Sequence, residues 1–75
     1  MHIKLIWDFF GTDAERTAKH HEIHLKEFAS IDKLDYLSSG VEQIKENHFI
    51  AFITVSKSNM PVFRDALKPH RGLKA

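Results

Sequence analysis

Three of the six histidines in this 75-residue chain lie within five positions, in the stretch AKHHEIHLKEF of residues 18–28. An imidazole can bind a divalent metal, transfer a proton near neutral pH, or serve only as a hydrogen-bonding group. At about 100° per residue around a helix, His21 falls on the apolar stripe, His24 on its border and His20 toward solvent. We therefore expect different surroundings for the three side chains.

Metal binding is one chemistry that these histidines could support. His20 and His24 are four residues apart, so their side chains lie on successive turns of one helix face. Zinc takes three protein ligands even in catalytic sites, and no third ligand stands at an informative spacing. The chain has no cysteine to supply a thiolate. Divalent-metal binding by His20 and His24 is therefore only an alternative, and no cofactor is expected.

A ligand pocket is a second possible use of the histidines. His21 on the apolar stripe needs a polar partner, and the strand face that carries Trp7 offers only an indole N–H and main-chain groups. A small cavity lined by His21, His24, Trp7 and Asp8 would meet this need, with an imidazole that binds a ligand or transfers a proton. The favoured interpretation is structural, with His21 hydrogen-bonded at the core edge, so no catalytic residue is assigned.

The elements that position these side chains follow from the apolar pattern and its breaks. Thr12 and Glu15 have the spacing of a capping box at a helix start, Pro61 suits a first helical turn, and Pro69 stops a helix. Gly40 indicates a bend or bulge in a strand at the sheet edge. The alternation predicts strands over 2–10, 36–44 and 48–56 and helices over about 13–29 and 60–68.

The predicted order of elements is β-α-β-β-α, in a single α+β domain of residues 1–75. A right-handed crossover and a hairpin between the second and third strands give a three-stranded sheet of order 2-3-1 with both helices on one face. This arrangement resembles the ferredoxin-like sandwich without its fourth strand. Residues 70–75 are predicted to be a flexible tail.

The absence of a fourth strand would affect assembly. The edge of the first strand would be unpaired, and the helix-free face of the sheet would carry apolar side chains. A homodimer through that face or through the free edge would bury them. The predicted interface residues are Ile6, Phe10, Ile50 and Phe52. In the alternative, the tail folds over the edge and these residues carry no partner.

Charge and hydropathy limit the classes of partner. The formal net charge is +1 and the two signs are interleaved, which favours neither a nucleic-acid partner nor a membrane surface. No apolar run is long enough for a membrane span or a signal peptide. The absence of cysteine is compatible with the reducing cytosol. We therefore expect a soluble, cytoplasmic protein.

These observations leave three functions open. The favoured one is a small homodimeric binding or interaction module that is not an enzyme and that has a small molecule as one possible ligand. The alternative is a small dimeric α+β-barrel enzyme in which a histidine performs acid–base chemistry on a small organic substrate. The second alternative is histidine-based binding of a divalent metal.

Overall fold

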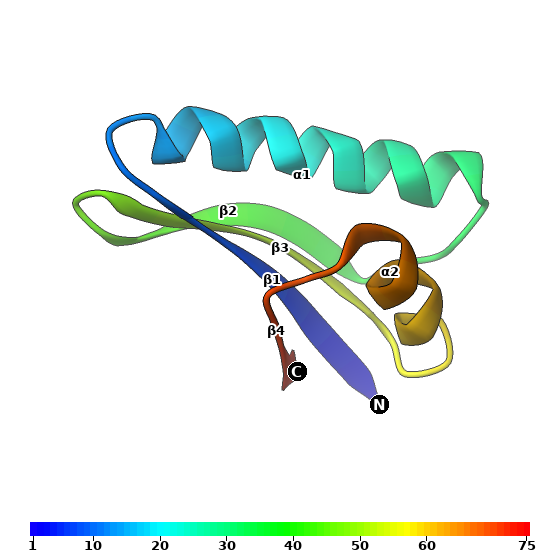
Figure 1. Cartoon of the computed structure of the whole chain (residues 1–75). Coiled ribbons are helices and arrows are strands. Elements are labelled where there is room, and N and C mark those ends of the chain that lie inside the picture. Colours follow the sequence, from blue (N-terminus) through cyan, green and yellow to red (C-terminus); the bar gives the residue numbers. More distant parts are fainter.

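The computed structural model describes all 75 residues of the chain. It is an α+β structure with four antiparallel strands and two helices (Figure 1). In chain order the elements are β1 (His2–Phe10), α1 (Ala14–Ile31), β2 (Ser38–Lys45), β3 (His48–Ser56), α2 (Met60–Leu67) and β4 (Arg71–Lys74). Both helices pack on one face of the sheet, because the buried core joins Leu25 of α1 and Phe63 of α2 to Ile53 of β3.

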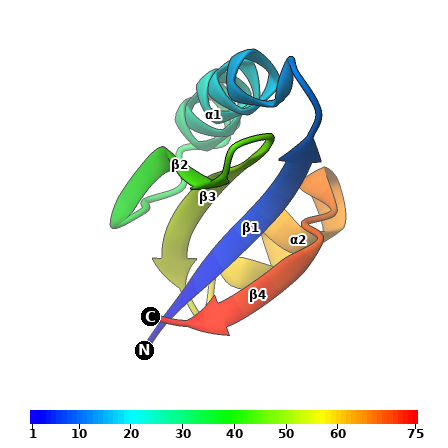
Figure 2. The same ribbon diagram turned by 90° about the vertical axis from the view of Figure 1, so that its left-hand side faces the viewer.

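A fourth strand completes the sheet, in the order β2-β3-β1-β4. The predicted order of the first three strands is confirmed, but the prediction that the fourth strand is missing is wrong. After α2, Lys68 adopts left-handed dihedral angles (φ 50°, ψ 64°) and Pro69 follows, so the helix ends and the chain turns back. Arg71–Lys74 then pairs with Ile3–Ile6 along the edge of β1 (Figure 2). The segment predicted to be a loose tail thus forms the strand.

The start of α1 differs from the predicted capping box. Asp13 is the N-cap residue, and no side chain caps the first turn by a hydrogen bond. Instead, Arg16 pairs with the Asp13 carboxylate at 2.9 Å and the Thr17 hydroxyl donates to the Asp13 carbonyl at 3.0 Å. The helix continues to Ile31, beyond the predicted end at residue 29. Neither helix is long and apolar enough to cross a membrane.

The helix-free face of the sheet, called the open face below, is covered in part by its own side chains. Ile6 and Ile50 point to this face, and they are only 2% and 3% exposed within the single chain. Phe52 is partly buried, whereas Phe10 at the end of β1 is 72% exposed. Two of the four predicted interface residues are therefore already buried without a partner.

Gly40 of β2 makes room for an aromatic ring on the open face. It is the antiparallel partner of Phe52, and a Cβ at Gly40 would stand 3.0 Å from Phe52 Cζ. The Lys4 ammonium lies 4.2 Å from the centroid of the same ring, in cation–π contact. The irregularity in the strand ladder lies between Gln43 and Lys45 rather than at Gly40. The glycine thus suits the close approach of the Phe52 ring rather than the predicted bend.

Candidate functional site

Asp8 is the centre of a charged cluster on the open face. It stands two residues from the end of β1, where its antiparallel partner is Ile50, and His48 at the start of β3 is paired with Phe10. On the other side of β1, the pairing of Arg71 with Ile6 places Arg71 diagonally opposite Asp8. Strand register therefore brings together residues that are up to 63 positions apart in sequence. We call Asp8, His48, His70 and Arg71 the Asp8 cluster.

Every member of the Asp8 cluster contacts Asp8 directly. Arg71 grips the carboxylate with two hydrogen bonds, from Nη2 to Oδ1 at 3.0 Å and from Nε to Oδ2 at 3.1 Å. His48 Nε2 lies 2.8 Å from Oδ1. The backbone N–H of Asp8 donates to His70 Nδ1 at 2.8 Å. The Asp8 side chain is only 15% exposed, so these contacts replace most of its water.

The electrostatics of the cluster keep Asp8 ionised. The hydrogen bond from Arg71 is the main cause that lowers the pKa of Asp8 below its ordinary value, while burial opposes it and the His48 hydrogen bond adds to it. The same pair raises the pKa of Arg71. A carboxylate held in this way by a guanidinium is poorly suited to donate or accept a proton in a reaction.

Besides its contact with Asp8, His48 packs against an aromatic side chain. Its ring stacks on Phe10 with a centroid separation of 4.3 Å and an interplanar angle of 21°. A carboxylate that orients an imidazole is a common arrangement in catalytic and metal sites. However, neither of the two surface hollows of the molecule is lined by Asp8 or His48. The single chain therefore encloses no space for a substrate at this imidazole.

His21 occupies the opposite, helix-facing side of the sheet. Its ring lies 4.9 Å from that of Trp7 and 5.5 Å from that of Phe9, measured between centroids. Its Nε2 is buried and has no hydrogen-bond partner, since the Trp7 indole N–H donates to the Leu67 carbonyl at 2.9 Å. The polar partner predicted for His21 is thus not present.

The surroundings of His21 favour its neutral form. Burial is the main cause that lowers the pKa of His21, and positive charge on His24, His70 and His20 lowers it further. Neither surface hollow is lined by His21 or Trp7. An imidazole in this position contributes packing, at the cost of one unpaired polar atom.

His20 and His24 form an exposed pair on α1. Their Nε2 atoms are 2.9 Å apart and their rings meet edge to face, while His24 Nδ1 lies 3.1 Å from Glu27 Oε1. No group of three histidine, aspartate or glutamate side chains in the protein is arranged to hold a metal ion. Both ring nitrogens of His24 are therefore engaged within the helix rather than directed at a shared third ligand.

The four residues predicted to line a pocket are distributed over both faces of the sheet. Trp7 and His21 are in contact, His24 lies one turn further along α1 beside His20, and Asp8 is on the open face. The chain thus joins Asp8 to His48, His70 and Arg71 instead. His70 and Arg71 were not predicted as site residues, because they reach Asp8 only through β4.

Comparisons of this chain with protein-family models, with curated proteins and with solved structures found no match. Its function is therefore inferred from the chemistry and geometry of its own residues. The two faces of the sheet offer different chemistry for that purpose. One carries a partly buried histidine with an unpaired Nε2, and the other carries a paired ion cluster beside an exposed phenylalanine.

Proposed function

We propose that this protein is a small, cytoplasmic, homodimeric binding module with a ferredoxin-like fold, and that two copies associate through the open face. The observation that carries the proposal is Phe10, a large aromatic side chain that is 72% exposed and stacked on His48 at the edge of a preorganised ion cluster. Aromatic and arginine side chains of this kind supply most of the binding energy at protein interfaces.

The charges of the open face are complementary to one another, which suits a two-fold interface. Lys4 pairs with Glu42 at 3.0 Å and Arg71 pairs with Asp8, so both signs occur on the same surface. A two-fold axis brings identical patches together, and a patch that carries both signs can match its own copy. A second copy is therefore the occupant that this surface fits.

An interaction role accounts for the ion cluster better than catalysis does. The Asp8 carboxylate is committed to Arg71 and His48, and the neutral His21 adjoins no hollow. The enzyme alternative keeps one favourable observation, the orientation of His48 by Asp8. It requires a partner chain to close a cavity over His48, so a dimer structure with a dry contact at this imidazole would contradict it.

The test of the dimer is the mass in solution. Light scattering at micromolar concentration should give twice the chain mass of 8.7 kDa for the wild type. Phe10→Asp should give the monomer mass, because it places a charge within the proposed contact. Ile23→Asp is the matched control, since Ile23 is 53% exposed on α1. Ile50→Lys would be unsuitable, because Ile50 is buried within one chain and its loss tests folding.

Two outcomes would contradict the proposal. A wild type that is monomeric at these concentrations excludes a stable homodimer. A dimer that Phe10→Asp leaves intact, while Ile23→Asp dissociates it, would move the interface from the open face to the outer face of α1.

A further inference from the structure

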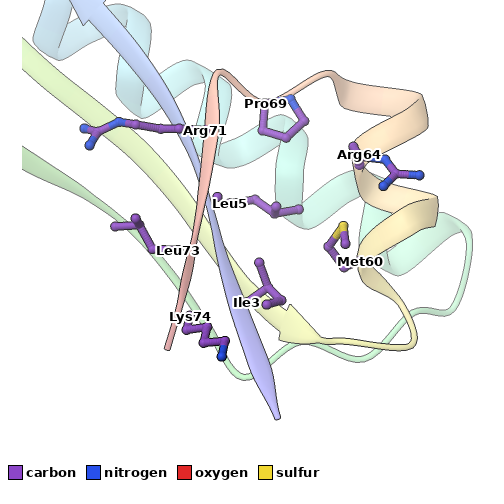
Figure 3. A pocket seen from close by; sticks show the side chains of 9 residues that line it. Ile3, Leu5, Met60, Arg64, Pro69, Arg71, Leu73 and Lys74 are labelled. Atoms are coloured by element: carbon purple, nitrogen blue, oxygen red, sulfur yellow. The ribbon is translucent and has the colours of Figure 1, made fainter.

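The largest hollow of the molecule lies between α2, β4 and the helix-facing side of β1 (Figure 3). Its volume is about 350 Å³. The apolar residues that line it are Ile3, Leu5, Met60, Pro69 and Leu73. Figure 3 shows Ile3 and Leu5 directed from β1 toward α2, with Met60 facing them. The hollow is thus an apolar recess at the edge of the core, between the helix-facing side of β1 and α2.

Gly72 creates much of this recess. It is paired with Leu5, and Lys74 with Ile3, so both turn the same side of β4 toward α2. A Cβ at Gly72 would stand 3.5 Å from Leu5 Cδ2 and 3.6 Å from Ile3 Cγ2, which is ordinary van der Waals contact. Gly72 does not have a positive φ. The backbone therefore does not require glycine here, and a larger side chain would occupy the recess.

The charged residues around the recess are all positive. Arg64 stands on the α2 side and Lys74 on the β4 side, and no acidic residue lines the recess. Lys74 has no ion-pair partner, and Arg64 pairs only with its exposed neighbour Asp65 at 3.1 Å. Arg71 also lines the recess, but its guanidinium is committed to Asp8. The occupant that this combination fits has an apolar body and an anionic group.

We propose that this recess binds a small amphiphilic carboxylate, with the apolar body against Ile3, Leu5 and Met60 and the carboxylate at the positively charged rim to which Lys74 and Arg64 belong. The volume is at the lower end of the range for ligand pockets, and it holds a molecule of about ten non-hydrogen atoms. The site is independent of the proposed dimer, because the Phe10 surface lies on the other face of the sheet.

Titration of the ¹⁵N-labelled wild type with octanoate tests the site. The amide signals of Gly72 and Met60 should shift saturably, with a dissociation constant below about 10 mM. 1-Octanol should bind about fivefold more weakly, because it lacks the charge, and octylamine should not bind. The absence of saturable shifts, or equal affinity for octanoate and 1-octanol, would overturn the proposal.

Substitution at Gly72 tests the position of the ligand. Gly72→Leu should abolish octanoate binding by filling the recess, whereas Gly72→Ala adds one methyl group against the wall and should retain most of it. A Gly72→Leu variant with native-like spectra and unchanged affinity would exclude the recess as the site.

Substitution of the cations tests the ligand class even if Gly72→Leu does not fold. The double variant Arg64→Gln/Lys74→Gln should lower octanoate affinity about fivefold and leave 1-octanol affinity unchanged. The control Lys19→Gln/Lys45→Gln removes two cations that do not line the recess and should change neither affinity. If both double variants lost octanoate affinity equally, net charge alone would account for the loss, and the proposed role of the rim cations would be contradicted.

Discussion

Trp7 and Asp8 are consecutive residues of β1 on opposite faces of the sheet. The ionisable group beside Trp7, His21, lacks a polar partner, whereas Asp8 has several. On the helix-facing side, His21 packs against Trp7 and Phe9 and its Nε2 has no partner. On the open face, Asp8 receives hydrogen bonds from Arg71 and His48 on both carboxylate oxygens.

The difference lies in the segments that reach each side of the strand. Arg71 of β4 brings a guanidinium to Asp8, so this largely buried carboxylate keeps its charge. His21 packs against the rings of Trp7 and Phe9 of β1, which leave its Nε2 unpaired and favour the neutral form. Whether Asp8 or His21 stabilises the fold therefore depends on the hydrogen-bond partners that distant segments provide, rather than on the residue type.

Removal of the Asp8 carboxylate should have the largest effect. Asp8→Ala leaves Arg71 and His48 without their acceptor and should lower the free energy of unfolding by about 2 kcal/mol. Urea unfolding followed by the fluorescence of Trp7 measures this value. The control is Asp65→Ala, which removes an exposed ion pair and should cost less than about 0.5 kcal/mol. Equal losses of unfolding free energy in the two variants would show that the Asp8 cluster stabilises the fold no more than an exposed ion pair does.

The stabilisation of the fold by Asp8 should decrease as the pH falls. Because the pKa of folded Asp8 lies below its ordinary value of 3.8, the unfolded chain takes up the proton first as the pH falls. The stabilisation is present above the ordinary value and is lost as the pH falls through the lowered one. The difference in unfolding free energy between wild type and Asp8→Asn should therefore shrink between about pH 5 and pH 2. A constant difference would show that Arg71 and His48 do not lower the pKa of Asp8.

His21 should respond in the opposite way to substitution. His21→Phe removes an unpaired polar atom from apolar surroundings and should leave the unfolding free energy at pH 7 unchanged or higher by up to about 1 kcal/mol. Because the pKa of folded His21 lies below its ordinary 6.5, the wild type loses stability as the pH falls below that value.

The pH dependence separates this role from simple packing. His21→Phe should show a smaller loss of stability between pH 7 and pH 5 than the wild type, and His20→Phe, on the exposed side of α1, should not. A large loss of stability in His21→Phe at pH 7 would mean that the imidazole has a polar partner after all.

The exposed histidine pair should have the smallest effect. His20→Ala and His24→Ala should each change the unfolding free energy by less than about 0.5 kcal/mol, because the side chains contact only each other and Glu27. We also expect no submicromolar binding of Zn²⁺ by calorimetry, since a third ligand is lacking. Tight stoichiometric binding that is lost in both variants would restore the metal alternative.

The parts of the fold that could be predicted are those that depend on local pattern. The apolar run of 48–56, the alternation of 2–10 and the crossover rule were sufficient for the order of the first three strands. β4 could not be predicted in this way, because Arg71–Lys74 contains no β-branched or aromatic residue and a glycine stands within it. It pairs because Pro69 returns the chain to an unpaired edge, which is a property of the whole sheet.

The candidate site was predictable to a similar extent. Helical periodicity was sufficient to distinguish His21 from His20 and His24. The strand pattern also indicated that few polar groups lie beside Trp7. The partners of Asp8 were not, since His48 reaches it across the register of β3 and Arg71 through β4. A basic residue soon after Pro69 is the one local signal, and it lies in the segment 70–75 that the sequence predicts to be a flexible tail.

The hydrogen bond between His70 and Asp8 has a consequence for aggregation. β4 pairs with β1 only as far as Ile6, and beyond that point an unprotected strand edge would invite another chain to add to it. There the His70 imidazole accepts the Asp8 N–H in place of a neighbouring strand's carbonyl. The His70 side chain thus ends the sheet where the chain, on its way from α2, has not yet entered β4. An added strand would find the Asp8 N–H already engaged.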